Sequence, residues 1–285
     1  MNPVQISSIA SKLLVSELKD DLNSIKQSND LTTFSLIKKN VEIQAIFINR
    51  EKMVLCGEYF LKRFLKKKFP EIKYYSNFKD GDFLEKKTSI IKISGNVKKI
   101  FMLERTLLNF IQHLSSISTH TRLFKNKIKG TNTKILDTRK TTTGLRKLEK
   151  YAAKIGGANN HRTGLFDKIF IKDNHIKILG GIDNTLTIIK KKKLKGFIIE
   201  CDTISQVKKC LNNSCDYILL DNMTTEQVKE CLNLKKNYKR KIIFEVSGGI
   251  NLLNIKSYAK LGVDFISTSK ITNSAKAVDI GLDIL

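Results

Sequence analysis

FIIECDTISQVKKCLNNSCDYILLD, residues 197–221, holds two short apolar runs separated by a segment long enough for one helix. The first run, 197–199, is followed at once by Glu200, and the second, 217–220, by Asp221. Apolar runs of this length with a helix-length connection are typical of parallel β-strands that are buried on both faces. We therefore predict two neighbouring parallel strands, each with a carboxylate at its carboxyl end.

The same pattern occurs on both sides of this stretch. Further short apolar runs lie at 135–136, 169–171, 242–244 and 263–266. Six such runs with helix-length connections predict parallel βα units. Polar or charged residues follow every run, and the carboxyl ends of the strands are where an α/β barrel has its active site. The pattern therefore favours an enzyme over a binding module.

Residues 1–100 have a different sequence pattern, a mixture of short helical and strand periodicities, which predicts a small α+β domain. Its expected elements are a helix over 6–14, a strand over 41–50, a helix after Gly57 and a strand over 89–93. An amphipathic helix over 104–114, which carries Arg105, leads into the second part of the chain.

The balance of charge is strongly basic. The chain has 285 residues with 52 Lys plus Arg against 27 Asp plus Glu, a formal net charge of +25. Such a charge normally indicates a nucleic acid or an anionic membrane as the partner. Only eight of the basic residues are arginine, however, and five of those fall between 105 and 162. Because the planar guanidinium suits carboxylate and phosphate, the clustered arginines are more informative than the lysines.

The cysteines and the hydropathy limit the class of protein further. Five cysteines without a C-x-x-C pair indicate reduced packing thiols, not a disulfide framework or a zinc site. No apolar run approaches the ~20 residues that a membrane helix needs. The first residues lack the pattern of a signal peptide. We therefore expect a soluble cytoplasmic protein.

The first group of candidate site residues is cationic. Its members lie in or beside the loops after two predicted strands: Arg139, Lys140, His161, Arg162 and Lys172. If they converge, they suit a ligand with several negative charges, and the two arginines favour bidentate binding of carboxylate or phosphate. For any single member the alternative is a solvated surface charge.

Two further groups are acidic and glycine-rich. Glu200 and Asp221 end neighbouring strands ~4.8 Å apart, so they suit Mg²⁺ or sugar hydroxyls, the alternative being structural acids that cap a helix or pair with a lysine. Ser247-Gly248-Gly249, before a helix pattern, and the loop 267–269 suit a phosphate. No ATP-binding or dinucleotide-binding glycine motif occurs. The three groups together predict a phosphate-bearing sugar, a divalent cation and a second substrate with more than one carboxylate.

Read as continuous text, the chain resembles the quinolinate phosphoribosyltransferase family. The matching segments are ILDTRKTTTGLR (135–146), GGANNHRTGLFD (156–167), IKDNHI (171–176), YILLDNM (217–223) and SGGI (247–250). The resemblance implies an α/β fold with an N-terminal α/β sandwich domain over 1–114 and a C-terminal open α/β (TIM-like) barrel over 115–274. It also implies that residues 275–285 pack back on the first domain.

The resemblance further implies a reaction and its participants. The phosphoribosyl group of phosphoribosyl pyrophosphate would pass to quinolinate with decarboxylation, in NAD biosynthesis. Mg²⁺ is the implied cofactor, and a homodimer or homohexamer with shared active sites is the implied assembly.

The resemblance also implies a role for each residue that matches a position of the family's motifs. The implied quinolinate site consists of Thr138, Arg139, His161, Arg162 and Lys172, with Arg105 reaching the partner subunit's site. The implied catalytic residues are Lys140, at the reacting centre, and Glu200 and Asp221, which would bind ribose hydroxyls and Mg²⁺. The implied phosphate loop consists of Ser247, Gly248, Gly249, Thr268 and Ser269.

Two departures and three alternatives qualify these expectations. The family usually has glycine at Ser269 and histidine at Asn273, and both changes fall on the expected phosphate loop. One alternative is a related phosphoribosyltransferase-like protein that uses another acid. The others are a nucleic-acid-binding protein driven by the net charge and a Schiff-base lyase that uses Lys140 or Lys172.

Overall fold

The computed structural model describes residues 2–24 and 26–285, and the chain divides into two compact units. The first unit consists of Met1–Arg122, Thr142–Gly157 and Ala275–Leu285. The second consists of Leu123–Thr141 and Ala158–Ser274. Each unit has its own sheet and its own buried apolar core.

The first unit is built on a four-stranded antiparallel sheet. Its strands, in spatial order, are β12 (Ile280–Ile284), β1 (Glu42–Asn49), β5 (Ser89–Asn96) and β3 (Lys73–Tyr75). Because successive side chains of a strand point to opposite faces, Ala45 and Phe47 of β1 are buried in the core. A separate short pair joins β2 (Met53–Val54) to β4 (Phe83–Leu84).

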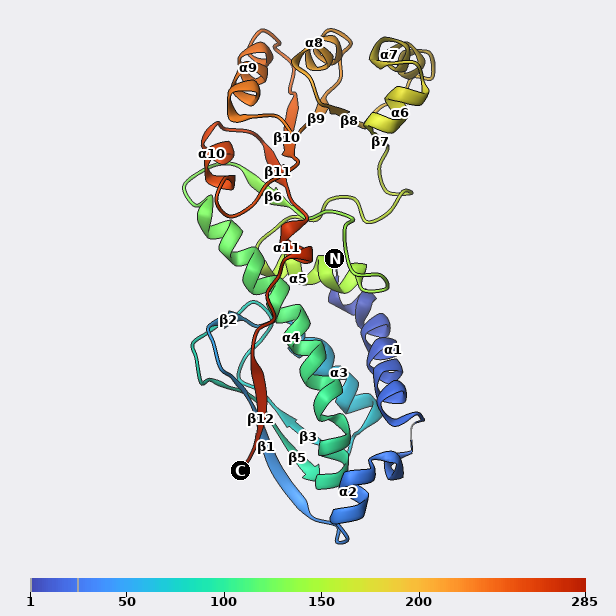
Figure 1. Cartoon of the computed structure of the whole chain (residues 1–285), viewed down its shortest axis with the longest axis vertical. Helices are drawn as coiled ribbons and strands as arrows, with labels where there is room; N and C mark the ends of the chain where they lie inside the picture. The colour runs from blue at the N-terminus through green and yellow to red at the C-terminus, as the bar shows by residue number, and fades with distance from the viewer. Residues whose placement is uncertain (1, 25) are drawn as a thin grey trace. The chain divides into compact units, whose positions relative to one another are not determined.

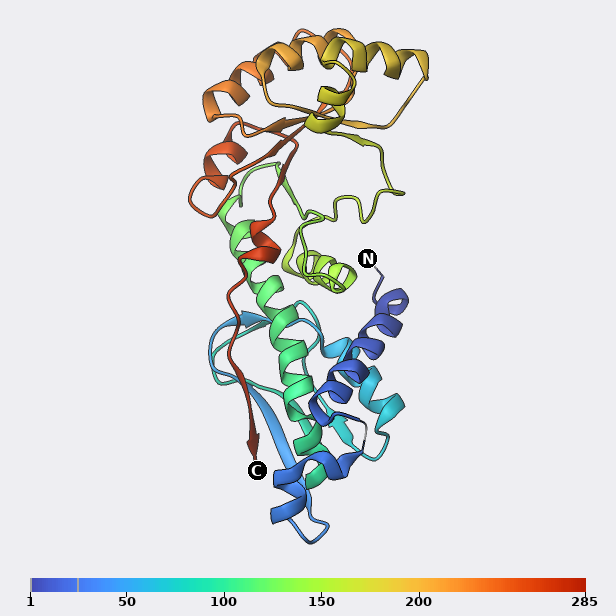
Figure 2. The ribbon, with the colours of Figure 1, turned by 45° about the vertical axis from the view of Figure 1, so that its right-hand side comes forward.

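Helices accompany this sheet (Figure 2). They are α1 (Pro3–Leu22), the 3-10 turn η1 (Gln27–Asn29), α2 (Leu31–Leu36), α3 (Glu58–Lys68), α4 (Val97–Lys127) and α5 (Arg146–Gly156). In α1, Ile6, Ala10 and Leu14 recur every fourth residue and are buried, which gives the helix one apolar stripe. The helix predicted over 104–114 is the middle of the longer α4.

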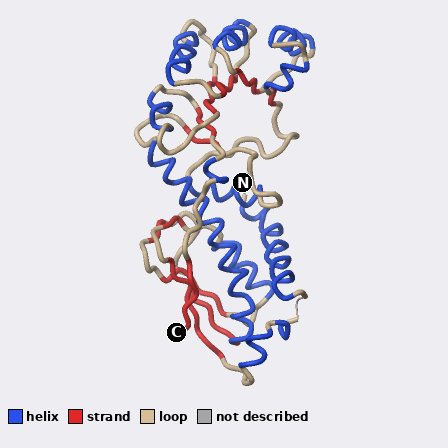
Figure 3. The backbone as a smooth tube through the Cα atoms, in the orientation of Figure 1, coloured by secondary structure: helices blue, strands red, loops and turns tan. Residues whose placement is uncertain are grey.

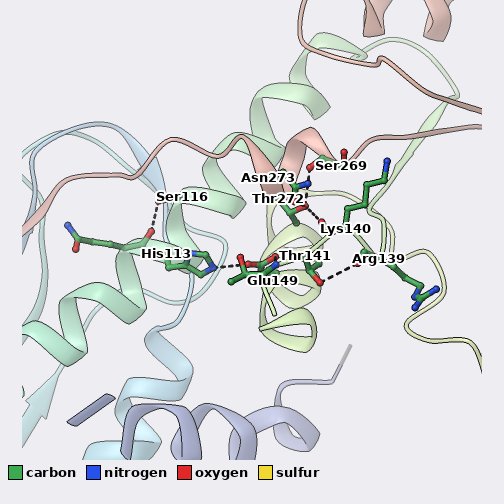
Figure 4. A network of polar contacts seen from close by, with 11 residues as sticks. His113, Ser116, Arg139, Lys140, Thr141, Glu149, Ser269, Thr272 and Asn273 are labelled. Carbon is green, nitrogen blue, oxygen red and sulfur yellow. Dashed lines mark hydrogen bonds and ion pairs between the residues drawn. The ribbon is translucent and has the colours of Figure 1, made fainter. Parts of the chain in front are cut away.

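Helix α5 groups with the first unit, although the predicted boundaries placed it in the second. The hydroxyl of Tyr151 donates to Asp80 at 2.8 Å, and the Phe60 and Tyr151 rings meet edge to face. The buried Glu149 accepts a hydrogen bond from the Thr142 amide at 3.2 Å and lies 3.0 Å from His113 Nε2 (Figure 4). These polar and aromatic contacts hold α5 to the first unit, and periodicity alone does not encode them.

The second unit is built on a parallel sheet of six strands, and all six predicted apolar runs lie in it. The strands are β6 (Lys134–Leu136), β7 (Phe170–Ile171), β8 (Ile198–Cys201), β9 (Tyr217–Asp221), β10 (Ile243–Ser247) and β11 (Phe265–Ser267). Their order is β6-β11-β10-β9-β8-β7, so the sheet curves round and stays open between β6 and β7 (Figure 3). This is the expected open barrel.

Helices cover the outer face of this sheet (Figure 1). They are α6 (Asp173–Ile178), α7 (Ile182–Lys191), α8 (Ile204–Asn212), α9 (Thr225–Lys235) and α10 (Ile255–Lys260). The short helix α11 (Lys270–Asn273) follows β11. The side chains of Thr203 and Thr224 accept hydrogen bonds from the first turns of α8 and α9, which fixes where those helices begin.

The strand register decides which side chains point to the inner face. Glu200 pairs with Leu219 and Leu219 with Glu245, while Asp221 pairs with Ser247 one layer further on. Paired residues of neighbouring strands point to the same face, and residues two apart do so as well. All five positions therefore face the inside of the open barrel. The intervening positions, such as Ile199, Ile218 and Val246, are fully buried under the helices.

Candidate active site

A hollow of about 280 Å³ opens at the carboxyl ends of the six strands. Every candidate site residue that belongs to the second unit lines it: Thr138, Arg139, Lys140, His161, Arg162, Lys172, Glu200, Asp221, Ser247, Gly248, Gly249, Thr268 and Ser269. Phe170, Leu219, Glu245, Ile250, Ser267 and Lys270 complete the wall. The strand-end pattern thus predicted a set of residues that the fold brings together.

The cationic wall is held in place by a buried carboxylate. Asp137, fully buried after β6, accepts hydrogen bonds from the His161 amide at 2.8 Å and from Asn160 Nδ2 at 2.6 Å. This fixes the loop that carries Arg162, whose Nη1 donates to the Lys168 carbonyl at 2.9 Å. Burial, and then repulsion from Arg139, lower the pKa of Arg162. An anionic ligand between the two arginines would relieve that repulsion.

The acidic wall consists of Glu200 and Asp221. Burial, followed by the charge of Asp221, raises the pKa of Glu200 to about 7, against the opposing effect of Lys172. Burial also raises the pKa of Asp221, which Lys140 opposes. Each carboxylate is therefore destabilised in its ionised form and has one lysine to offset part of that cost. A further cation would favour the ionised form of both.

The backbone around Lys140 is anchored on both sides. Its amide donates to Thr138 Oγ1 at 3.1 Å, and its carbonyl accepts from Thr272 Oγ1 at 2.8 Å (Figure 4). The side chain remains exposed to the hollow. A lysine on a fixed backbone with a mobile ammonium suits contact with a charged group that shifts during a reaction.

Ser247-Gly248-Gly249 forms a tight loop where β10 ends. Gly248 and Gly249 have φ angles of 88° and 62°, which favour glycine. A Cβ atom at Gly248 would lie 2.2 Å from Asn222 Oδ1, so the backbone of the two loops meets too closely for a side chain. The loop therefore exposes its backbone to the hollow, as anion sites require.

The helix expected directly after this loop begins later than the pattern suggested. Leu252 and Leu253 lie in a turn, and α10 starts only at Ile255. Asn251 Oδ1 accepts hydrogen bonds from the Leu253 amide at 2.8 Å and the Asn254 amide at 3.3 Å, so its side chain caps this turn. The helix dipole that we expected next to Gly249 is therefore set back from it.

Comparison with known proteins decides the family. The family model for the N-terminal domain of quinolinate phosphoribosyl transferase matches residues 30–115, and that for its C-terminal domain matches residues 117–283. The chain belongs to the quinolinate phosphoribosyltransferase family. Both predicted parts of the chain are thus parts of one family architecture.

Relatives and solved structures agree with this assignment. A probable nicotinate-nucleotide pyrophosphorylase [carboxylating] from Methanocaldococcus jannaschii is 36% identical, over 97% of each chain. The nicotinate-nucleotide pyrophosphorylase structure from Ehrlichia chaffeensis is 39% identical with a TM-score of 0.88, over 96% of this chain and 98% of that one. The structure from Francisella tularensis is 34% identical with a TM-score of 0.88, over 98% and 97%.

The ring nitrogens of His161 make contacts within the protein. Its Nδ1 accepts a hydrogen bond from the Arg162 amide at 2.7 Å, so this nitrogen carries no proton. Its Nε2 is buried and lies 3.4 Å from Glu245 Oε2. Both ring nitrogens therefore lie against protein groups. In this member of the quinolinate phosphoribosyltransferase family, His161 thus braces Arg162.

Sequence reasoning missed Glu245, which lies on the floor of the hollow. It is fully buried, and its Oε2 accepts a hydrogen bond from the Tyr217 hydroxyl at 2.6 Å. Its Oε1 has no hydrogen-bond partner among the described residues. The available signal was an acid directly after the apolar run 242–244 and before the apolar Val246, since a carboxyl group in a buried strand must face a polar interior.

Thr268 was expected to bind phosphate, yet both of its donors are engaged within the protein. Its hydroxyl donates to the Ile250 carbonyl at 2.8 Å and its amide to the Leu136 carbonyl at 3.3 Å. The same hydroxyl accepts from the Lys270 amide at 3.1 Å. Thr268 therefore shapes the loop that presents Ser269 to the hollow. Asn273, the other departure from the family pattern, does not line the hollow.

Arg105 and a metal site are the remaining expectations from the sequence. Arg105 lies exposed on α4 in the first unit and is not among the residues that line the hollow. Within residues 2–24 and 26–285, no three His, Cys, Asp or Glu side chains are close enough together to hold a metal ion. In the same described part of the chain, no helix is long and apolar enough to cross a membrane.

Proposed function

We propose that this chain transfers the phosphoribosyl group of phosphoribosyl pyrophosphate to the ring nitrogen of quinolinate and releases the 2-carboxylate as CO₂. The products are nicotinate mononucleotide, CO₂ and pyrophosphate, as a step of NAD biosynthesis. The observation that carries this proposal is one hollow with three chemically distinct walls. Arginines suit a dicarboxylate, carboxylates suit ribose and a divalent cation, and a glycine loop suits the 5′-phosphate.

The dicarboxylate end consists of Arg139, Arg162 and Lys172. Arg139 Nε is buried and has no hydrogen-bond partner among the described residues, so it is a donor without an acceptor. A carboxylate supplies that acceptor, and two arginines hold two carboxylates in a fixed plane. In this role the arginines orient the pyridine ring so that its nitrogen faces the ribose.

Glu200 and Asp221 fit Mg²⁺, the cofactor that we propose. Their pKa values are both raised, by burial first, and a divalent cation favours the ionised forms. Two carboxylates are fewer ligands than the ion needs, which suits Mg²⁺ because substrate phosphates and water complete its shell. When bound, the ion would neutralise the leaving pyrophosphate.

The chain's own residues then act on the reacting atoms. As the bond from ribose C1′ to pyrophosphate breaks, Glu200 and Asp221 stabilise the positive charge on the ribose. Lys140 lies beside the leaving oxygens and offsets their charge. The pyridine nitrogen forms the new bond to C1′ and becomes positive, so its charge stabilises the electron pair that stays on C2 when CO₂ departs. A proton from solvent then takes the place of CO₂.

We further propose a homodimer, or a larger assembly such as a homohexamer, in which Arg105 serves the partner's site. Arg105 is exposed on α4 and is not among the residues that line this chain's hollow, which supports that role. For the compartment we propose the cytoplasm, because all five cysteines are free, buried thiols, which suits a reducing environment.

The alternatives make different predictions. A nucleic-acid-binding protein would bind DNA with steep salt dependence. A Schiff-base lyase would be trapped on Lys140 or Lys172 by borohydride with a carbonyl substrate. A related transferase for another acid would turn over phosphoribosyl pyrophosphate without quinolinate as the acceptor.

The deciding experiment is incubation with quinolinate, phosphoribosyl pyrophosphate and Mg²⁺, followed by detection of nicotinate mononucleotide. Calorimetric titration of the Arg139→Ala variant should show quinolinate affinity reduced about 10- to 100-fold, the value of a charge-assisted hydrogen bond, with phosphoribosyl pyrophosphate affinity within about twofold. Arg50→Ala, at an exposed arginine of the first unit, is the matched control. Unchanged quinolinate affinity in Arg139→Ala would exclude the dicarboxylate role.

A further inference from the structure

Without a bound ligand, the cationic side chains of the hollow repel one another and need a stabilising contact. That contact must leave their N–H groups free to bind the substrate. Burial and the charge of Arg139 lower the pKa of Arg162, while Asp167 opposes the change. An acidic side chain at the tip of each cation would stabilise it, but it would also occupy the N–H groups that a substrate carboxylate needs. The structure meets this requirement in another way.

Phe170, on the edge strand β7, lines the hollow and carries three of these groups on its ring. The Arg162 guanidinium carbon lies 4.9 Å from the ring centroid, and Lys172 Nζ lies 5.4 Å from it. The imidazole of His161 stacks on the same ring at 5.7 Å with an interplanar angle of 27°. One phenyl ring thus contacts every member of the cationic wall except Arg139 and Lys140.

We propose that Phe170 is a positioning residue for the dicarboxylate substrate: its ring fixes Arg162 and Lys172 while leaving their outward N–H groups to the ligand. This inference rests on the proposed function, since it assigns a support to the quinolinate end of that site.

The electrostatics of an aromatic ring explain why phenylalanine suits this position. The face of the ring is negative because of its quadrupole, so it attracts a guanidinium or an ammonium within about 6 Å of the centroid. The attraction needs no hydrogen bond, so it does not consume donors. An aliphatic side chain of similar size would fill the space but would leave the two cations to repel each other.

The register of β7 places the Phe170 ring on the same face as the cation that it supports. Phe170 and Lys172 are two residues apart on one strand and its extension, so they share the inner face, and Phe170 pairs with Ile198 of β8. His161 stacks on the ring and accepts the Arg162 amide, so the ring and the loop fix each other. Replacing the ring should therefore weaken ligand binding at the dicarboxylate end of the hollow more than at the Gly248 loop.

The test compares full-length Phe170→Leu and Phe170→Tyr with the wild type in steady-state turnover. Phe170→Leu should raise KM for quinolinate about tenfold and leave KM for phosphoribosyl pyrophosphate within about twofold, because only the dicarboxylate end loses its support. Phe170→Tyr keeps the aromatic face and should retain nearly the wild-type KM. Phe197→Leu, at a half-buried phenylalanine outside the hollow, is the matched control and should change neither constant.

A second measurement separates electrostatics from packing. Replacing Phe170 by mono-, di- and trifluorinated phenylalanine weakens the quadrupole stepwise at nearly constant volume, so quinolinate KM should rise with each step. A KM that is flat across this series, or equal in Phe170→Leu and wild type, would overturn the proposal. Wild-type protein that neither binds quinolinate in titration nor forms nicotinate mononucleotide would instead overturn the proposed function, and a wild type that does both leaves Phe170 to be judged by its variants.

Discussion

At the scale of single residues, Glu200 illustrates how function opposes stability. It is half-buried, Asp221 lies close to it, and its pKa is raised to about 7 by burial first and by that neighbour second. The folded state therefore binds the Glu200 proton more tightly than the unfolded chain, whose carboxyl titrates near 4.5. The contribution of Glu200 to the free energy of unfolding is therefore fully present below about pH 4.5 and is lost as the pH rises toward 7.

The variant Glu200→Gln should therefore separate the two properties. At about pH 8 we expect Tm to rise by about 2 °C, because a buried charge is removed, while turnover falls by at least about 100-fold because the ribosyl cation loses its carboxylate. Thermal unfolding at two pH values, together with product formation, measures both. Glu226→Gln, at a fully exposed acid, is the control. A Tm that falls at pH 8 would contradict the expected sign of the stability change.

The same carboxyl predicts a pH dependence of activity. Only the ionised form of Glu200 can stabilise the ribose or bind Mg²⁺, so kcat/KM for phosphoribosyl pyrophosphate should rise with pH and level off above a midpoint near 7. Raising the Mg²⁺ concentration should move the midpoint to lower pH, since the cation favours the carboxylate. Rate profiles at two Mg²⁺ concentrations test this, and a midpoint indifferent to Mg²⁺ would argue against a metal role.

At the scale of elements, the loop after β10 depends on Gly248. Its φ of 88° penalises any side chain, and so does the distance of 2.2 Å that would separate an added Cβ atom from Asn222 Oδ1. Gly248→Ala should cost about 3 kcal/mol of unfolding free energy and raise KM for phosphoribosyl pyrophosphate more than KM for quinolinate. Urea unfolding and steady-state kinetics provide the two readouts.

Gly262→Ala is the matched control for this loop. Its φ of 86° is nearly the same, but nothing lies within 4 Å of the added Cβ position. It should cost only about 1 kcal/mol, the value of the backbone conformation alone. If the two variants are equally destabilised, the contact with Asn222 has no energetic weight.

The elements also show what the sequence can and cannot predict. The six strands were predictable because parallel strands that are buried on both faces have short apolar runs in the sequence, and polar residues follow these runs at or near the strand ends. The start of α10 was not, because it depends on a local turn in which Asn251 Oδ1 accepts hydrogen bonds from the amides of Leu253 and Asn254. The grouping of α5 was not either, since it depends on contacts of Tyr151 with residues far away in sequence.

Within the site, the same distinction applies. Arg139, Glu200 and Asp221 follow apolar runs and were found for that reason. Phe170 lies inside an apolar run, where the pattern reads it as core, and Glu245 lies within β10 between the run 242–244 and the strand end, although both line the hollow. Their position becomes visible only with the strand register, which sets the inner and outer faces.

At the scale of the whole molecule, the net charge of +25 has two parts. Lysine runs such as Lys66–Lys68 and Lys190–Lys193 are exposed, so most of the charge lies on solvated surface. The arginines Arg139 and Arg162 are partly buried and line the hollow. Only the second part bears on the proposed ligands, and a polyanionic nucleic acid is not needed to explain it.

The assembly makes the last prediction, because a site completed by Arg105 of a second chain can be divided between two inactive variants. Arg105→Ala and Arg139→Ala should each lose activity alone. In a hybrid of the two, one site has the intact Arg139 of one chain and the intact Arg105 of the other, while the second site lacks both. Hybrids purified through two different affinity tags should therefore retain about half of the wild-type turnover per dimer. Doubly tagged Arg139→Ala dimers serve as the inactive control. Inactive hybrids would show that Arg105 acts within its own chain, because each hybrid site would then carry one defect.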